Sequence, residues 1–464
     1  MSHELRTPMN GIIGFTDLVL TTSLQRAQRE YLENVRKSAY GLLTIINDIL
    51  DFSKLEAGKL FIDNSSFRLN ELVEETVDLL AVKAYEKKLE MLFWTDPQLP
   101  ALFNGDATRI RQVLVNLLGN AIKFTETGEI FIRVNKTGNI YYRNDKKLVD
   151  ITISVQDSGI GIADEKLSQV FESFTQADSS TTRKYGGTGL GLTISKSLAE
   201  LMGGTLTAES AAGQGSIFTL RLALEILDDH PQPIAAEKPL LKSVLVVDDN
   251  AANRQLMQGI FDYLQISCEI TSGGEEALAA IARAAANAQP FDLIITDHHM
   301  PGMDGIMLAR EIARQTTAAH NPVVLMLSSL EKNMYRYEAE QTGIHKFLSK
   351  PVKLHELNDT LLSLFNNQPV GTVEQPQHPT INKFANATSV MVVEDEPLNM
   401  LLISEVLHKM GFAVIKAGNG REAIDLLHAS TPALIFMDVN MPEMDGFAAT
   451  SFIRGLPGHI AAIP

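Results

Sequence analysis

A histidine, a carboxylate and a threonine stand close together at the start of the chain, in the segment Met-Ser-His-Glu-Leu-Arg-Thr-Pro. In a helix, His3 and Thr7 share one face because side chains four positions apart stack on the same side, and Glu4 lies at the edge of that face. A neutral imidazole can attack a phosphoryl group, a neighbouring carboxylate can accept its ring proton, and a hydroxyl can orient a water. Pro8 removes a backbone donor and predicts a kink just beyond. A histidine beside a glutamate is usually an exposed pair without a catalytic role, so the other motifs of the chain must decide between the two interpretations.

A second set of side chains has the types that bind a metal and phosphate. Asn116, Asn120 and Lys123 are spaced four and three apart, so they line one face of a helix expected at about residues 106–123. Amide oxygens can ligate Mg²⁺, and a lysine can meet phosphate. Taken alone, such a pair of asparagines is more often a cap or a surface feature.

Glycine-rich turns follow this helix. The segment Asp157-Ser-Gly-Ile-Gly comes after an expected strand, and its carboxylate can accept a hydrogen bond from an adenine amine while Gly159 and Gly161 let the base approach. The run Gly-Gly-Thr-Gly-Leu-Gly-Leu at 186–192 opens a helix, whose first amides and dipole favour phosphate. The candidate residues in this run are Gly187, Gly189 and Gly191.

The second half of the chain contains an internal repeat. Residues 243–249, Ser-Val-Leu-Val-Val-Asp-Asp, match residues 389–395, Ser-Val-Met-Val-Val-Glu-Asp, and residues 293–305 match residues 434–446. Continuous apolar strands that alternate with helices predict a parallel doubly wound sheet, and the ligands of such a sheet gather at the carboxyl ends of its strands.

Acidic groups fall at those strand ends in both copies, and such a cluster predicts a divalent cation between the acids. Helix capping would explain one acid per strand but not five groups in register. The five groups of the first copy are Asp248, Asp249, Asp297, Ser328 and Lys350, and the acids of the second copy are Glu394, Asp395 and Asp438.

Composition bounds the class of protein. At 464 residues the chain is long enough for about three domains. Its net charge of −16 argues against nucleic acid as a direct partner, because such proteins carry basic patches. The single cysteine, Cys268, excludes a disulfide framework and fits a reducing compartment. No apolar run approaches the roughly 18 residues of a membrane span. Both ends interrupt a motif, so we expect a piece of a longer protein.

The elements that position these groups can be predicted from periodicity. Residues 3–55 favour a helical hairpin whose second helix carries an apolar seam at steps of three and four, and two such hairpins would pair into a dimeric four-helix bundle. The alternative is a hairpin packed on another domain of its own chain. Residues after Gly58 indicate an α+β sandwich, with strands at 60–63, 89–94, 130–134, 150–156, 205–209 and 216–222, and helices at 70–87, 106–123, 165–170 and 190–201.

The resulting domain organisation is a hairpin (1–58), an α+β domain (59–226), a linker (227–242), a first doubly wound α/β domain (243–366), a second linker (367–388) and an incomplete second α/β domain (389–464).

Together and in this order, the motifs of the first half resemble the N, G1, F, G2 and G3 boxes of the histidine-kinase ATP-binding domain, a branch of the GHKL ATPases, and the first eight residues resemble the H box. This resemblance implies that His3 is the phosphoacceptor, Glu4 the base and Thr7 a residue shared with a reverse phosphatase reaction. It also implies that Asn116, Asn120 and Lys123 hold Mg²⁺ and phosphates and that Asp157 reads adenine. The stretch between Phe174 and Gly186 resembles the ATP lid.

The repeat resembles response-regulator receiver domains. Asp297 and Asp438 then match the phosphorylated aspartates, and the preceding acid pairs match the metal ligands. In the first copy Ser328 and Lys350 match the switch hydroxyl and the phosphate lysine. Two histidines, His298 and His299, follow the acceptor, which is not the commonest pattern.

The whole order is similar to hybrid sensor histidine kinases of the BarA/GacS-like group, although two receivers are not their commonest arrangement. This implies an ATP- and Mg²⁺-dependent protein-histidine kinase that passes phosphate from His3 to Asp297, or to Asp438 in the parent protein. It also implies a homodimer, a downstream histidine-phosphotransfer domain or response regulator, and a cytoplasmic portion of a protein anchored in the bacterial inner membrane. The alternatives are a GHKL ATPase used as a conformational clamp and a kinase-dead scaffold.

Overall fold

The computed structural model describes residues 2–173, 189–231, 240–315, 323–328, 342, 344–365, 388–456 and 458–464. The chain divides into two compact units, Met1–Asp51 with Thr372–Pro464, and Phe52–Gly371. None of the helices in the described part of the chain is long and apolar enough to cross a membrane.

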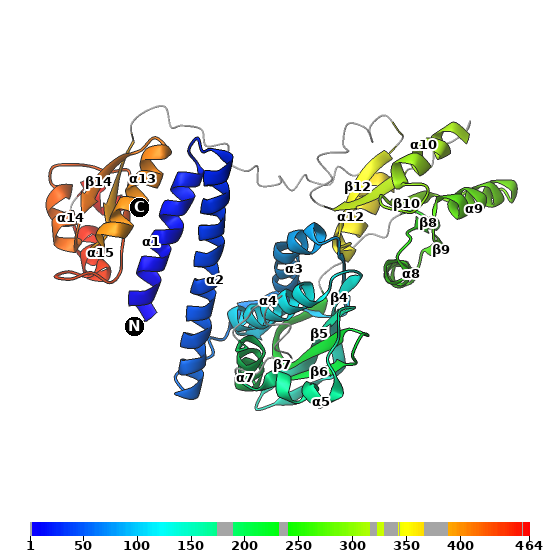
Figure 1. The fold of residues 1–464 in the computed structure, drawn as a ribbon, viewed down its shortest axis with the longest axis horizontal. Helices are drawn as coiled ribbons and strands as arrows, with labels where there is room; N and C mark the ends of the chain where they lie inside the picture. Colours follow the sequence, from blue (N-terminus) through cyan, green and yellow to red (C-terminus); the bar gives the residue numbers. More distant parts are fainter. Residues whose placement is uncertain are drawn as a thin grey trace. The chain divides into compact units, whose positions relative to one another are not determined.

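The predicted helical hairpin is present in the first unit (Figure 1). Helix α1 (Ser2–Leu20) continues through Pro8, and α2 (Arg26–Glu56) runs back beside it. Their shared core is small: among the side chains that the structure describes, Met9, Ile13 and Ala39 are buried in it, and Leu43 and Ile46 are partly buried. The hairpin therefore leaves much of its apolar surface uncovered within one chain.

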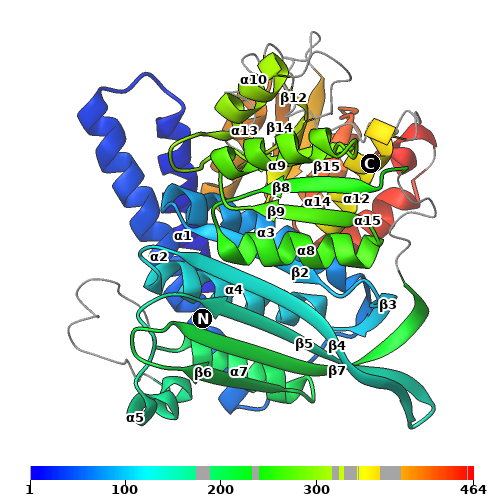
Figure 2. The ribbon, with the colours of Figure 1, turned by 90° about the vertical axis from the view of Figure 1, so that its right-hand side faces the viewer.

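The α+β domain of the second unit forms a sheet of seven strands in the order β1-β3-β7-β5-β4-β2, with β6 paired to β7 (Figure 2). Helices and strands share one continuous apolar core, as predicted for a sandwich. The strands are β1 (Ser65–Phe67), β2 (Glu90–Thr95), β3 (Pro100–Gly105), β4 (Glu129–Arg143), β5 (Lys146–Asp157), β6 (Thr205–Ser210) and β7 (Ser216–Pro231). The helices are α3 (Leu69–Glu86), α4 (Ala107–Phe124), α5 (Asp164–Leu167), the 3-10 turn η1 (Gln169–Phe171) and α7 (Gly191–Leu201).

Several predicted elements of this domain were wrong in detail. The strand predicted at 60–63 is absent: Leu60 is buried but Phe61 is 84% exposed, and the strand forms at β1 instead. Strand β3 was missed because it starts at Pro100, and proline usually argues against a strand. Strands do tolerate proline at their first position, which is where Pro100 lies. Strand β7 runs on to Pro231, into the predicted linker, and the helix predicted at 165–170 is divided between α5 and η1.

The first α/β domain is a five-stranded parallel sheet in the order β12-β11-β10-β8-β9, which confirms the doubly wound prediction. Its strands are β8 (Ser243–Val247), β9 (Ser267–Thr271), β10 (Leu293–Asp297), β11 (Val323–Ser328) and β12 (Ile344–Lys350). The described helices are α8 (Ala251–Leu264), α9 (Gly274–Ala286), α10 (Gly305–Gln315) and α12 (Leu354–Phe365).

The second α/β domain has a parallel sheet of three strands, β14-β13-β15, in line with the incomplete domain expected. Strand β15 is partly covered at its outer edge, because the Ile435 amide donates to the Pro464 carbonyl at 3.0 Å. The elements are β13 (Ser389–Val393), α13 (Pro397–Lys409), β14 (Ala413–Ala417), α14 (Gly420–Leu427), β15 (Leu434–Met437), α15 (Gly446–Arg454) and η2 (Gly458–Ala462).

Within the first unit, α13 packs against α1. The Leu402 side chain fills the space beside Gly14, where a Cβ would lie 2.5 Å from Leu402 Cδ2. The incomplete α/β domain therefore rests on the helix that carries the histidine motif.

Candidate functional site

The histidine motif lies on the first turns of α1. The backbone places His3 and Thr7 four positions apart on a continuous helix, as the spacing predicts. The side chains of His3 and Glu4 lie outside the described part of the structure, and Thr7 is half-buried. The geometry of the proposed proton transfer therefore stays a prediction.

The asparagine face of α4 meets the start of α7. The Asn116 amide nitrogen donates to Ser195 Oγ at 2.9 Å, and the Asn120 amide nitrogen lies 3.5 Å from Asn116 Oδ1. Both asparagines are half-buried. Burial lowers the pKa of the Lys123 ammonium, whose Nζ lies 4.8 Å from the centre of the Phe124 ring. Sequence reasoning missed Ser195, although it lies one helical turn after Gly191 and so faces the same way.

Asp157 closes the other side of this region at the end of β5. Its carboxyl is buried, and Oδ1 accepts the Gly159 amide at 2.8 Å. Burial raises the pKa of Asp157, and hydrogen bonds from the Gly159 and Ser216 backbones partly offset that rise. A further hydrogen-bond donor would therefore stabilise the ionised form of this buried carboxyl.

Two glycines let this loop pack tightly. A Cβ at Gly159 would lie 2.6 Å from the Phe124 carbonyl oxygen, at the end of α4. Gly161 has φ +66, and a Cβ there would lie 2.0 Å from the Ala211 carbonyl oxygen. The Asp157 loop is therefore held against the same helix that carries Asn116 and Asn120.

The glycine run is described only in part. Residues 174–188, which include the predicted lid and Gly187, lie outside the described structure. Gly189 has φ +70, a conformation that favours glycine, and α7 begins at Gly191. A Cβ at Gly191 would lie 2.4 Å from Asn116 Oδ1. The start of α7 thus touches the asparagine face directly.

This contact predicts that Gly191→Ala displaces Asn116 and lowers the affinity for ATP about tenfold or more, which is the cost of about one lost polar contact. Isothermal calorimetry measures the effect. Gly119→Ala is the matched control, because a Cβ at this α4 position meets nothing within 4 Å. Equal affinities for the two variants would show that Asn116 does not need this close approach.

The acids of the first α/β domain converge as predicted. Single carboxylate oxygens of Asp248, Asp249 and Asp297 all lie within 4.8 Å of one another. Lys350 Nζ lies 2.9 Å from Asp297 Oδ1 and 3.9 Å from Asp248 Oδ2. Ser328 pairs with Lys350 across β11 and β12, which places it at the same edge, but its side chain is outside the described structure.

The charges and burial of this cluster fit a cation site. Burial raises the pKa of Asp248 to about 7 and also raises that of Asp297. Burial alone would lower the pKa of Lys350, but the surrounding carboxylates raise it. Asp248 Oδ2 is buried and has no hydrogen-bond partner among the described residues. Hard carboxylate oxygens with one unmet acceptor fit Mg²⁺.

A fourth carboxylate at this cluster was not predicted. Glu90, the first residue of β2, accepts a hydrogen bond from Lys350 Nζ at 2.6 Å. Nothing in the sequence signalled it, because the two residues are 260 positions apart and Glu90 belongs to no motif. The paired histidines after the acceptor are in contact, with ring centres 4.4 Å apart.

The second α/β domain repeats the acid cluster in a more open form. Single carboxylate oxygens of Glu394, Asp395 and Asp438 lie within 4.8 Å of one another, and Asp395 is exposed. Burial raises the pKa of Glu394, while a hydrogen bond from Asn399 at 3.1 Å opposes the rise.

Three family models match the chain. Residues 1–58 match the His Kinase A (phospho-acceptor) domain, and residues 105–226 match the histidine kinase-, DNA gyrase B- and HSP90-like ATPase. Residues 244–362 and 390–463 each match the response regulator receiver domain.

Two relatives align with nearly the whole chain. The sensor histidine kinase GacS of Pseudomonas protegens is 34% identical over 454 residues, which cover 98% of this chain and 48% of the relative. The signal transduction histidine-protein kinase BarA of Escherichia coli K12 is 34% identical over 465 residues, with the same two shares. The chain thus spans about half the length of these relatives.

A solved structure also aligns with nearly the whole chain. The full-length structure of ShkA in complex with AMPPNP has a TM-score of 0.60 and 27% sequence identity, and the match covers 98% of this chain and 89% of that one.

Proposed function

Because the chain belongs to the hybrid sensor histidine kinases, we propose that it transfers the γ-phosphoryl group of ATP to His3 and then to a receiver aspartate. The observation that carries this is the junction of α4 and α7, where Asn116, Ser195 and Gly191 meet beside the Asp157 loop. Here α1 and α2 are the phospho-acceptor hairpin, the α+β domain is the ATP-binding domain, and the two α/β domains are receiver 1 and receiver 2.

The nucleotide has a defined place in this proposal. The buried Asp157 carboxylate accepts a hydrogen bond from the adenine amine, and the backbone amides at the start of α7 face the phosphates. Asn116 and Asn120 would hold Mg²⁺, and Lys123 would meet a phosphate oxygen. The metal, when bound, neutralises charge that develops on the transferred group.

The transfer steps need only groups of this chain as nucleophiles. The His3 ring nitrogen attacks the γ-phosphorus while Glu4 takes the ring proton, a nitrogen–phosphorus bond forms, and ADP leaves. An Asp297 oxygen then attacks the same phosphorus and the imidazole leaves. Lys350, 2.9 Å from Asp297, would neutralise the new acyl phosphate, and Asp248 and Asp249 would hold a second Mg²⁺. Thr7 would orient water in the reverse phosphatase reaction.

Incubation with γ-labelled ATP separates this proposal from the alternatives. Label retained covalently by the chain supports a kinase. ATP hydrolysis without covalent label supports a conformational clamp, and neither product supports a scaffold.

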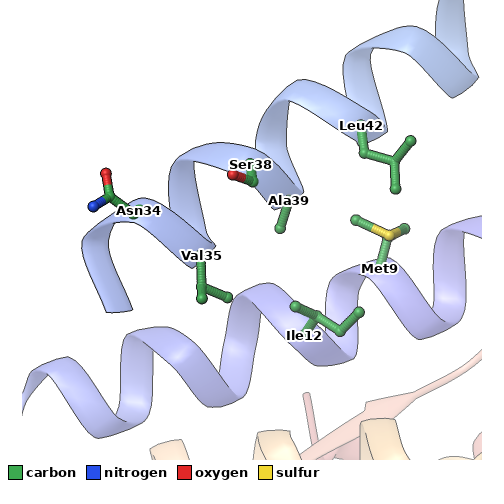
Figure 3. Close-up of a pocket in the computed structure, with 7 residues that line it drawn as sticks. All are labelled: Met9, Ile12, Asn34, Val35, Ser38, Ala39 and Leu42. Carbon is green, nitrogen blue, oxygen red and sulfur yellow. The ribbon is translucent and has the colours of Figure 1, made fainter. Parts of the chain in front are cut away.

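We also propose a homodimer through the hairpin. An open apolar groove of about 400 Å³ runs between α1 and α2 (Figure 3), lined by Met9, Ile12, Asn34, Val35, Ser38, Ala39 and Leu42. The predicted seam of α2 consists of Leu32, Val35, Ala39, Leu42, Ile46 and Ile49. Of these, Val35 at 46%, Leu42 at 47% and Ile49 at 48% remain exposed within one chain. A second hairpin would cover this surface and complete a four-helix bundle.

Leu42→Glu is accordingly expected to convert the dimer to a monomer at micromolar concentration, because a charge in an apolar interface is left unpaired. Light scattering measures the mass. Lys37→Glu on the same helix is the control, since Lys37 is exposed and off the seam. A wild-type protein that scatters as a monomer would refute the assembly.

The partners beyond the chain remain predictions. A downstream histidine-phosphotransfer domain or response regulator would accept the phosphate, with no direct role for nucleic acid. Membrane anchorage through a further N-terminal region likewise stays a prediction.

A further inference from the structure

Receiver 1 meets the ATP-binding domain through its own phosphorylation pocket. Glu90 Oε1 accepts hydrogen bonds from Lys350 Nζ and from Asn253 Nδ2, both at 2.6 Å. Lys350 is 8% exposed and the Glu90 side chain 26% exposed, so water screens this pair poorly. The same ammonium lies 2.9 Å from Asp297. Glu90 therefore shares the lysine that the acyl phosphate would need.

Further polar contacts surround this pair, and in all of them the charges are arranged in the same direction between the two domains. The Asn250 amide nitrogen donates to Glu129 at 2.8 Å, and Lys353 Nζ donates to Asp78 at 2.6 Å. His355 Nδ1 lies 3.4 Å from Glu74, and its pKa is raised chiefly by that hydrogen bond. In each pair the receiver supplies the donor and the ATP-binding domain supplies the carboxylate. The two surfaces are complementary in charge.

Apolar side chains continue the contact. Leu92 of β2 is fully buried and belongs to the receiver core formed with α8 and α12. Trp94 and Phe131 pack against the same core. Helix α8 lies beside β2 (Figure 2). The docked state therefore buries an apolar surface as well as the Glu90–Lys350 pair.

A phosphoryl group on Asp297 would disturb this arrangement. It carries up to two negative charges and three strong acceptor oxygens, and Lys350 is the cation beside it. Glu90 would then face this new charge across one shared ammonium. Attraction of Glu90 to Lys350 would give way to repulsion by the phosphoryl oxygens.

We propose that Glu90 is a latch that docks receiver 1 on the ATP-binding domain while Asp297 is unmodified, and that phosphorylation of Asp297 displaces Glu90 and releases receiver 1. The proposal rests on the proposed function in one respect, namely that Asp297 is a phosphoacceptor. Coupling of this kind is reciprocal, so docking also disfavours phosphorylation of Asp297. Since Asp297 is only 5% exposed when docked, the phosphohistidine must meet an undocked receiver.

Trp94 gives a direct readout, because it is the only tryptophan of the chain and packs in the docked interface. Beryllofluoride with Mg²⁺, a mimic of the aspartyl phosphate, is added to the full chain without ATP, so His3 plays no part. Binding is verified by fluorine NMR. We expect a red shift of Trp94 emission and faster hydrogen exchange in β2 and α8. Asp297→Asn is expected to abolish both changes.

Variants test the latch itself. Glu90→Gln removes the charge at constant shape and is expected to shift the docking equilibrium roughly ten- to a hundredfold toward the undocked state. Its Trp94 emission should be red-shifted before beryllofluoride is added. Glu86→Gln, an exposed glutamate at the end of α3, should behave as wild type. If Glu90→Gln does not fold, Asp78→Ala, which removes the partner of Lys353 at the rim, should give the same shift in smaller degree.

Three results would overturn the latch. The first is unchanged Trp94 emission and hydrogen exchange in wild type with bound beryllofluoride. The second is full undocking by Mg²⁺ alone, which would make the metal the releasing agent. The third is wild-type docking in both Glu90→Gln and Asp78→Ala. A chain that undocks with beryllofluoride but takes no label from ATP would refute the kinase and leave the latch standing.

Discussion

Asp157→Asn is expected to weaken ATP binding by roughly 1–3 kcal/mol, or about five- to 150-fold in affinity, because a charge-assisted hydrogen bond to the adenine amine is lost. The Asp157 carboxyl is buried at the end of β5 and already accepts the Gly159 amide. An asparagine at this position keeps the shape but presents a neutral amide. A nucleotide without an exocyclic amine on its base should bind the variant and the wild type about equally.

Calorimetry with ATP measures this change. Asp150→Asn is the matched control, because Asp150 lies on the same strand but is exposed and accepts a hydrogen bond from the Tyr141 hydroxyl. The control should keep wild-type affinity. Unchanged affinity in Asp157→Asn would remove Asp157 from the adenine site.

The parts of the fold with strong local signals were predictable. Continuous apolar strands ending in acids, repeated once, specified two parallel sheets and brought Asp248, Asp249 and Asp297 together. Helical spacing placed Asn116 and Asn120 on one face of α4. In both cases the prediction depends on the repeat of residue types along a single strand or helix, and residues close in sequence determine that repeat.

The parts that depend on distant packing were not predictable. Strand β3 opens with a proline, and its identity as a strand comes from pairing with β1 and β7. Leu92 reads as an ordinary strand residue of the ATP-binding domain, yet it completes the core of receiver 1. Glu90 likewise acquires its role only from docking, since a single glutamate carries no periodic signal. Sequence patterns indicated the chemistry at strand ends but not which surface would cover it.

Receiver 2 shows the same limit at its end. The incomplete sheet was predicted, but the cover that Pro464 gives to β15 was not, because this backbone contact has no sequence signal. Receiver 2 has its three acids in a more open cluster, in which Asp395 is exposed, and the described residues include no lysine paired with Asp438. This difference bears on the route of the phosphate.

We expect phosphate in this chain to move from His3 to Asp297 and not to Asp438. Receiver 1 has the complete set of acids with Lys350 2.9 Å from the acceptor, so its acyl phosphate is neutralised. Among the described residues no lysine pairs with Asp438. Asp297→Ala should therefore abolish the acyl phosphate, whereas Asp438→Ala should leave it unchanged. Base-labile label that survives in Asp297→Ala and vanishes in Asp438→Ala would reverse the route.

The most direct test of the account is covalent labelling of the full chain with γ-labelled ATP and Mg²⁺, with wild type, His3→Gln and Asp297→Ala compared after acid and base treatment. Phosphohistidine is acid-labile and base-stable, and acyl phosphate is base-labile. The account predicts both kinds of label in wild type, only the acid-labile, base-stable kind in Asp297→Ala, and none in His3→Gln. Label in His3→Gln equal to that of wild type would contradict it.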